Sequence, residues 1–210
     1  MNKTTRIIKQ IISMYPDAEC ELVHKNAYEL LVATMLSAQT TDKQVNIVTP
    51  TLFEHFPTPE KLANANIEVV KACINSIGFY NTKAENIIQT AKILVKDYGG
   101  EVPGKMELLT KLPGVGRKTA NVVLSNAFDI PAFAVDTHVK RVCFRLRLTK
   151  NTDPDKVEAD ITSKIPKYMY NKAHHAIIFH GRRTCKATGP LCHLCELSIE
   201  CPHYKSLAPK

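Results

Sequence analysis

The sequence predicts an all-α fold, on three observations. Apolar residues recur at helical spacing along nearly all of the 210 residues. A capping residue followed by proline, as at Thr58-Pro59 and Asp153-Pro154, is typical of a helix start. No stretch alternates convincingly as a strand, because the apolar run over residues 133–135 is too short. We therefore expect roughly ten short helices packed into a compact protein.

Individual helices are predicted from their apolar faces. The helix over residues 28–39 has one face made of Leu30, Leu31, Thr34, Met35 and Ala38. The stretch 81–97 has a face made of Ile87, Ile88, Ala91, Leu94 and Val95. Each set recurs at three- and four-residue spacing, so each helix is expected to bury one side.

Two further helices are expected in the second half of the chain. One begins at Arg117 and carries the apolar stripe Ala120, Val123, Leu124 and Ala127. At about 100° per residue, Lys118 lies nearly opposite that stripe, together with Asn121 and Ser125. The next helix follows Asp136, has Val139, Val142, Cys143 and Leu146 on one side, and has four basic residues on its other flanks: Lys140, Arg141, Arg145 and Arg147.

Charge is distributed unevenly along the chain. Residues 1–110 carry 11 Lys/Arg and 12 Asp/Glu, a net charge of −1, whereas residues 111–210 carry 17 and 8, a net charge of +9. A basic half beside a neutral half favours a polyanionic partner such as nucleic acid, although basic faces also occur without one. The N-terminal isoleucines are interrupted by Lys9 and Gln10, so no secretion or targeting signal and no membrane segment is expected. We expect a cytoplasmic protein.

Four of the seven cysteines lie within 17 residues, with the spacing C-x6-C-x2-C-x5-C. They are Cys185, Cys192, Cys195 and Cys201. The spacing favours a [4Fe–4S] cluster, because zinc sites usually have two C-x2-C pairs and only one is present. Zinc, disulfides and free thiols remain alternatives. Four protein ligands leave no open coordination position, so the centre is expected to stabilise the tail. The other cysteines, Cys20, Cys73 and Cys143, are expected to be small buried hydrophobes.

A glycine-containing turn separates two predicted helices at residues 112–116, Leu-Pro-Gly-Val-Gly. Two glycines in five residues allow a sharp turn and a close approach to a partner. The helix that follows presents unpaired N–H groups at its positive end, which suits a phosphate. A simple helix–helix turn is the alternative interpretation.

Lys118 and Asp136 are the candidate catalytic residues. Lys118 is either a solvated or phosphate-contacting lysine or a nucleophilic amine. The helix N-terminus and Arg117 both disfavour its ammonium form, and a neutral amine is what Schiff-base chemistry requires. Asp136 is predicted to cap the following helix with an ionised carboxylate, which can stabilise a positive transition state or assist proton transfer.

Together these patterns closely resemble the endonuclease III family, bifunctional DNA glycosylases of the helix-hairpin-helix superfamily. The combination of hairpin, lysine, Val-Asp-Thr-His and cysteine spacing is specific, and the similarity extends over about residues 30–201. The matching segments are residues 36–39, 77–81, 112–123, 135–138 and 180–182 and the four-cysteine tail.

The resemblance implies a helix-hairpin-helix DNA glycosylase fold with two helical lobes. A six-helix barrel would cover residues 20–130, with the hairpin at about 105–127. Residues 1–19 would join residues 131–210 in a second lobe, whose loop 185–201 would hold a [4Fe–4S] cluster on the four cysteines. DNA would bind in the cleft between the lobes.

The resemblance also implies a base excision repair reaction. The enzyme would remove oxidised or ring-damaged pyrimidines from double-stranded DNA, form a Schiff base through Lys118 with the support of Asp136, and cleave the strand 3′ to the abasic site by β-elimination. Gln39 would fill the space left by the flipped nucleotide, and Phe79 would insert as a wedge unless it packs in the core. The further DNA-binding residues would be Gly114, Val115, Gly116 and His138. A monomer associated with the bacterial nucleoid is expected.

Two competing functions are weighed against this one. An adenine-removing mismatch glycosylase shares hairpin and cluster but needs an acidic residue on the helix before Gln39, where this chain has Thr34. A non-catalytic DNA-binding or redox module would use Lys118 as a phosphate contact and Asp136 as a cap. His174, His175 and His180 are expected in core packing or phosphate contact rather than in catalysis. The loop 186–191 has only one basic residue, so its part in DNA binding is in doubt; Arg182 and Arg183 are expected to take up some of it.

Overall fold

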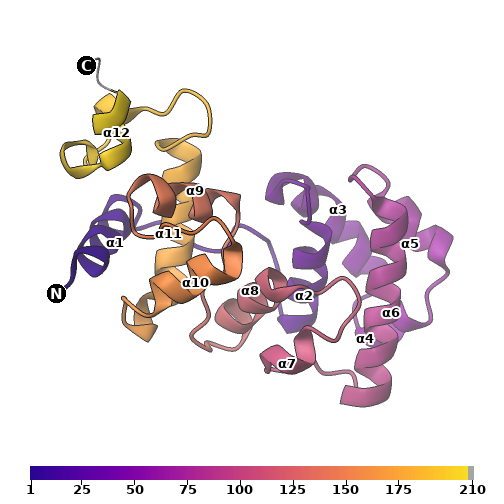
Figure 1. Cartoon of the computed structure of the whole chain (residues 1–210). Helices are drawn as coiled ribbons and strands as arrows, with labels where there is room; N and C mark the ends of the chain where they lie inside the picture. Colours follow the sequence, from indigo (N-terminus) through magenta and orange to yellow (C-terminus); the bar gives the residue numbers. More distant parts are fainter. Residues whose placement is uncertain (208–210) are drawn as a thin grey trace. The chain divides into compact units, whose positions relative to one another are not determined.

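The computed structural model of the chain describes residues 1–207, and all of its regular structure in that range is helical (Figure 1). The all-α prediction is confirmed. Contacts divide the chain into two compact units: one is Cys20–Ile130, and the other combines Met1–Glu19 with the chain from Pro131 onward. No helix within residues 1–207 is long and apolar enough to span a bilayer.

The unit Cys20–Ile130 contains seven helices, of which α4 and α7 have five residues or fewer. Both α4 and α5 pack against α6, and α8 packs against α2. The resemblance implies six barrel helices, whereas this unit has seven, or five when the short α4 and α7 are left out. The bounds are α2 Ala27–Leu36, α3 Asp42–His55, α4 Pro59–Ala63, α5 Ile67–Ile74, α6 Tyr80–Tyr98, α7 Met106–Leu109 and α8 Arg117–Ala127.

Helix α2 is buried on every side, so burial includes the predicted apolar face from Leu30 to Met35 and extends beyond it. All residues from Tyr28 to Leu36 are buried, because α3, α6 and α8 surround the helix. Ala38, assigned to the same face, lies beyond the helix end and is exposed. The small and apolar residues of α2 therefore fit a central helix rather than an amphipathic one.

Helix α6 confirms the helical pattern over residues 81–97 and extends it by one residue at each end. Its C-terminus is capped by Gly99 in the left-handed conformation. Its N-terminus is unusual, since Phe79 at the N-cap is also left-handed (φ 58°) and gives no side-chain cap. The capping signals at Thr58 and Asp153 behave as predicted, and each accepts a backbone N–H in the first turn of its helix.

In the other unit, α1 and α9 both pack against α11 (Figure 1). The side chains of Ile7, Ile8 and Ile11 are at most 1% exposed and belong to the same core as the apolar faces of α9, α10 and α11. The bounds are α1 Lys3–Met14, α9 Thr137–Arg145, α10 Pro154–Thr162, α11 Tyr170–Arg183 and α12 Pro202–Leu207, with 3₁₀ turns at Lys167–Met169, Cys192–Leu194 and Ser198–Glu200.

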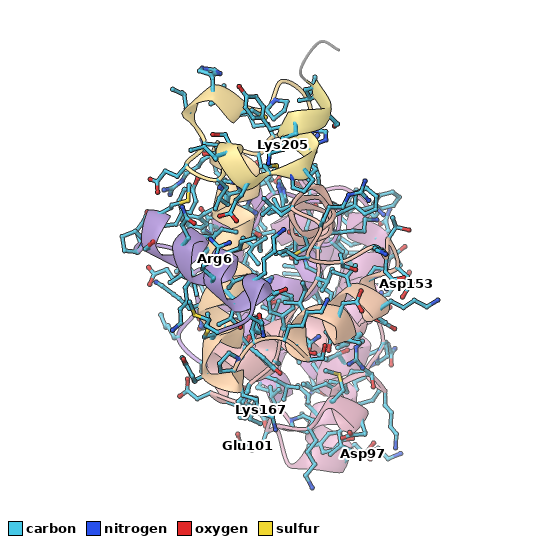
Figure 2. All side chains as sticks on the ribbon, turned by 60° about the vertical axis from the view of Figure 1, so that its left-hand side comes forward. Arg6, Asp97, Glu101, Asp153, Lys167 and Lys205 are labelled. Atoms are coloured by element: carbon cyan, nitrogen blue, oxygen red, sulfur yellow. The ribbon has the colours of Figure 1, made fainter. Side chains whose placement is uncertain are left out.

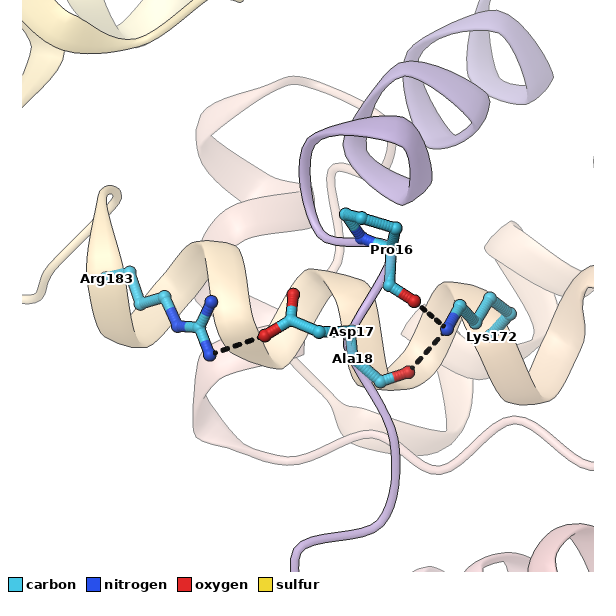
Figure 3. A network of polar contacts seen from close by, with 5 residues as sticks. All are labelled: Pro16, Asp17, Ala18, Lys172 and Arg183. Atoms are coloured by element: carbon cyan, nitrogen blue, oxygen red, sulfur yellow. Dashed lines mark hydrogen bonds and ion pairs between the residues drawn. The ribbon is translucent and has the colours of Figure 1, made fainter.

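Polar contacts fasten the segment after α1 onto α11 (Figure 3). Lys172 Nζ donates hydrogen bonds to the carbonyl oxygens of Pro16 (2.7 Å) and Ala18 (2.9 Å). Arg183 forms an ion pair with Asp17 (3.1 Å) and also lies 4.3 Å from the ring centroid of Phe179. The N-terminal helix is thus an integral part of the unit that contains the cysteine-rich tail.

Candidate functional site

The glycine hairpin connects α7 to α8 and is anchored from inside. Leu112 and Val115 are buried, and the Val115 N–H donates to the Leu112 carbonyl (3.1 Å). Thr90 Oγ1 of α6 donates to the Pro113 carbonyl (3.1 Å). The loop is therefore held between its own apolar residues and α6, with Gly114 exposed at its outer edge.

The two glycine positions of the hairpin differ in what a side chain would meet there. Gly114 has φ 75°, and a Cβ at that position would lie 2.9 Å from Asn86 Nδ2. Gly116 has φ −89°, and a Cβ there would meet no atom within 4 Å. Gly114 is thus required by the backbone, whereas Gly116 leaves the surface open for the approach of another molecule.

The N-terminus of α8 is open to solvent. Gly116 is its N-cap and offers no side-chain acceptor, and Arg117 and Lys118 are both exposed. Exposed N–H groups at the positive end of a helix form an anion-binding site. Asn121 and Ser125, predicted to lie on the same side of the helix as Lys118, are only 2% and 4% exposed, whereas Lys118 is exposed.

Gln39 and Phe79 lie in loops of the same unit and share an uncommon backbone conformation. Their φ angles are 55° and 58°, in the left-handed region that glycine usually occupies. Gln39 is exposed, and the side chain of Phe79 is 67% exposed. Phe79 is therefore not a core residue, and the core-packing alternative for it is wrong. Left-handed non-glycine residues with solvated side chains are typical of functional sites.

Asp136 caps α9 as predicted. Its Oδ1 accepts a hydrogen bond from the Val139 N–H (2.8 Å), and the residue is half-buried. Asp136 belongs to the unit that contains α1 and α11, whereas Lys118 belongs to the unit Cys20–Ile130. The carboxylate is held by the backbone of its own helix, so its orientation is set within its own unit.

His138 follows in the first turn of α9, and its ring is oriented by Arg141. Arg141 Nη2 lies 3.2 Å from His138 Nδ1 and donates to the Gly181 carbonyl at 2.8 Å. A guanidinium can only donate, so Nδ1 of His138 accepts and its proton resides on Nε2. Burial lowers the pKa of Arg141, although nearby acidic groups partly offset that effect. The role of Arg141 in orienting His138 had no sequence signal beyond its place on a basic flank.

The four clustered cysteines line a single small pocket, which is partly open to solvent. All four are half-buried and free of disulfides. Burial and the other three cysteines raise the pKa of the Cys195 thiol. The remaining lining residues are Leu146, His180, Thr184, Ser198, His203 and Tyr204.

The four thiols of this pocket are a potential donor set for a metal centre. Within residues 1–207, no group of three or more His, Cys, Asp or Glu side chains is arranged to hold one metal ion. Four thiols spread around one pocket suit a larger group with several metal atoms, for which each cysteine binds a different corner. The residues present therefore fit a cubane cluster.

Arginines hold the loop that carries these cysteines. Arg145 of α9 donates to the carbonyls of Lys186 (2.6 Å) and Ala187 (3.1 Å), and its Nη1 lies 3.5 Å from Cys185 Sγ. Arg6 of α1, labelled in Figure 2, forms a two-pronged ion pair with Glu200 at 2.9 and 2.6 Å. Part of the predicted basic flank of α9 is thus used to position the loop.

The three histidines of α11 are buried, at 3%, 6% and 1% exposure for His174, His175 and His180. His174 Nδ1 lies 2.8 Å from the Ala134 carbonyl. Burial lowers the pKa of His180 to about 4, so its ring is neutral near pH 7. Of the two expected roles, core packing is the one observed. Among the isolated cysteines, Cys143 is buried as predicted, whereas Cys20 and Cys73 are only half-buried.

The fold and the hairpin agree with comparisons to known proteins. Residues 32–167 match the family model described as HhH-GPD superfamily base excision DNA repair protein. Endonuclease III of Bacillus subtilis is 50% identical over 195 residues, which is 92% of this chain and 89% of the relative. Endonuclease III of Escherichia coli is 42% identical over 205 residues, 97% of each chain.

Solved structures give the same result. A non-covalent endonuclease III–DNA complex matches with a TM-score of 0.93 and 46% identity, covering 98% of both chains. A trapped covalent endonuclease III–DNA intermediate also matches with a TM-score of 0.93 and 46% identity, covering 98% of this chain and 99% of that chain. The chain belongs to the endonuclease III family of the HhH-GPD superfamily, and it is a DNA repair glycosylase and abasic-site lyase.

Proposed function

We propose that this enzyme excises oxidised or ring-damaged pyrimidines from duplex DNA and nicks the strand with Lys118 as nucleophile. The observation that carries the proposal is the place of Lys118, exposed in the first turn of α8 directly after the hairpin. The likeness to a trapped covalent endonuclease III–DNA intermediate supports it. The enzyme acts as a monomer on chromosomal DNA.

The hairpin grips the DNA backbone. Gly114 and Gly116 bring the chain close to a phosphate, and Val115 anchors the loop from below. The open N-terminus of α8 contributes N–H donors that favour an anion. His138 adds a donor through its Nε2 proton. These groups contact phosphate rather than base edges, so they position the enzyme without reading sequence.

Base flipping depends on Gln39 and Phe79. A damaged base pair is unstacked at a cost of about a few kcal/mol, and the cost is lower than for an intact pair. The exposed aromatic ring of Phe79 inserts between bases, and Gln39 fills the space that the flipped nucleotide leaves. Selection of the lesion follows in part from this difference in unstacking energy.

The chemistry then proceeds at the sugar. The amine nitrogen of Lys118 attacks C1′, the bond from C1′ to the damaged base breaks, and the base leaves after accepting a proton. The nitrogen then loses a proton and the C1′–O4′ bond breaks with O4′ taking up a proton, so the sugar ring opens and a Schiff base forms between C1′ and Lys118. The Schiff base acidifies C2′, so loss of a C2′ proton expels the 3′ phosphate, and hydrolysis of the Schiff base later releases the enzyme. Asp136 stabilises the positive charge that develops on the sugar and assists proton transfer.

The cysteine pocket holds a [4Fe–4S] cluster through Cys185, Cys192, Cys195 and Cys201. Such a cluster supplies electron transfer chemistry and structural cross-linking, and with four protein ligands it leaves no site for substrate. Preparations made with adequate iron should be brown and contain about four iron atoms per chain. A colourless protein that binds one zinc ion instead would contradict the assignment.

The assignment of Lys118 is tested by borohydride trapping on an abasic-site duplex. The native enzyme should become covalently linked to DNA, whereas Lys118→Gln should give no cross-link and should lose on the order of 10³-fold or more in lyase rate. Lys111→Gln, which removes the same charge from an exposed position beside the hairpin, is the control and should still be trapped.

Binding measured on the same duplex separates an enzyme from a passive DNA clamp. Lys118→Gln should keep its affinity within a few-fold, because the phosphate contacts come from the hairpin backbone. Strand cleavage that persists in this variant would show that another group is the nucleophile. A panel of duplexes with single lesions, thymine glycol among them, identifies the preferred base.

A further inference from the structure

Lys83, in the first turns of α6, is a buried lysine that the proposed chemistry does not use. It is only 7% exposed, although lysine is almost never buried without partners. Burial lowers its pKa. A charged group removed from water at this position has to be compensated by specific contacts.

The ammonium group of Lys83 contacts the loop that carries Gln39. Its Nζ donates to the Leu36 carbonyl (2.8 Å) and to Thr40 Oγ1 (2.9 Å). Leu36 is the last residue of α2, so its carbonyl lies at the negative end of that helix, where a cation is favoured. Leu36 and Thr40 flank Gln39 on both sides in the sequence.

The backbone of the same residue contacts the second loop. The N–H of Lys83 donates to the carbonyl of Phe79 (3.0 Å). A more exposed contact joins the first turn of α3 (Asp42–His55) to the segment before Phe79, with Gln44 Nε2 donating to Ser76 Oγ at 3.0 Å. The bond to Phe79 is the first backbone hydrogen bond of α6, whose N-cap is Phe79, so the ammonium group of Lys83 ties the start of α6 to the loop that carries Gln39.

A non-glycine residue in the left-handed conformation is strained and persists only where surrounding contacts determine it. We propose that Lys83 is a positioning residue that holds Gln39 and Phe79 ready for insertion into the DNA stack by clamping their two loops together. This inference rests on the role proposed above for Gln39 and Phe79. The clamp removes the need to order both loops at the moment of flipping, when a displacement of about 1 Å can cost 100-fold in rate.

The test uses Lys83→Met, which keeps the apolar stem and removes the ammonium group. Lys92→Met is the matched control, because Lys92 is an exposed lysine on the same helix. Excision of thymine glycol from a fully paired duplex should fall about 10- to 100-fold in Lys83→Met and stay within about twofold in Lys92→Met. Amide hydrogen exchange at residues 37–41 should become faster only in Lys83→Met.

A readout of insertion distinguishes positioning from general loss of structure. With 2-aminopurine placed beside the lesion, Lys83→Met should show a slower fluorescence rise on binding, while trapping on an abasic site in an unpaired bulge should stay within about threefold, because flipping there costs less. Equal losses on the paired and the bulged substrates would overturn the proposal.

A milder variant covers the case in which Lys83→Met folds poorly. Thr40→Val removes one acceptor of the ammonium group at a half-buried position and should reduce excision about threefold to tenfold. Combined with Gln39→Ala, it should add less than its separate effect, since both act through Gln39. Full additivity would overturn the clamp. If Gln39→Ala and Phe79→Ala themselves leave excision unchanged, the proposed flipping role fails instead.

Discussion

The hairpin around Gly114 and the two loops around Gln39 and Phe79 reach the left-handed backbone region in different ways. At the hairpin the residue is glycine, with φ 75° and no room for a Cβ against Asn86. At the other two positions the residues keep large exposed side chains at φ 55° and 58°. The hairpin presents its backbone to the DNA, so a side chain at Gly114 would block the approach of the phosphate. The other loops offer side chains, so they retain the strain and need external contacts such as those of Lys83.

The largest effect is expected from Gly114→Ala. Alanine at this φ costs about 1–2 kcal/mol, and the clash of its Cβ with Asn86 adds a similar amount. We expect the free energy of unfolding to fall by about 2–4 kcal/mol in urea denaturation. A loss below about 0.5 kcal/mol would show that the loop is free to relax, and the contrast between the loops would disappear.

Gly116→Ala should separate binding from folding. Its φ of −89° suits alanine, and no atom lies within 4 Å of the new Cβ. The free energy of unfolding should therefore change by less than about 0.5 kcal/mol. Affinity for an abasic-site duplex should fall about tenfold, because the added methyl group faces the approaching phosphate backbone. Fluorescence anisotropy at fixed salt measures this, and unchanged affinity would place the DNA contact elsewhere.

Phe79→Gly tests whether the strained backbone at position 79 is retained because the phenyl ring is needed as a wedge. Relative to Phe79→Ala, the glycine variant should be more stable by about 1 kcal/mol, since glycine adopts positive φ without penalty. Both variants should excise thymine glycol more slowly than the native enzyme because both lack the wedge. An alanine variant as stable as the glycine variant would mean that the loop relaxes without the phenyl ring.

The smallest expected effect is a partial recovery of the stability lost in Gly114→Ala. Asn86→Ala removes the atoms that crowd position 114 and should recover about 1 kcal/mol in the Gly114→Ala background. The backbone strain remains, so rescue should be incomplete. Complete recovery would attribute the whole requirement for glycine to packing rather than to φ.

Much of the fold follows from local signals that the sequence carries in full. Asp136, Thr58 and Asp153 cap their helices as predicted because a cap depends on residues within one turn. The glycine turn at 112–116 is visible for the same reason. The combination of sequence motifs indicates the family without any knowledge of which residues are in contact.

The structural features that could not be predicted from the sequence depend on contacts between segments that are distant in the chain. In the sequence, Lys83 resembles an ordinary solvated lysine on a helix. In the structure it is buried, and its ammonium group donates hydrogen bonds to oxygen atoms of residues more than 40 positions earlier in the chain. The left-handed conformations of Gln39 and Phe79 are hidden because neither residue is glycine. Asn121 and Ser125 are polar yet buried, and the apolar stripe of α8 does not indicate which of its polar side chains are covered.

The packing of α1 against α11 has a consequence for synthesis on the ribosome. The unit Cys20–Ile130 is continuous in sequence and can fold as soon as it emerges, but α1 has to wait for Tyr170–Arg183. At about 5–20 residues per second, that delay is on the order of 10–30 s. During this interval the isoleucine face of the first helix is accessible to chaperones, so slowed translation should lengthen its exposure.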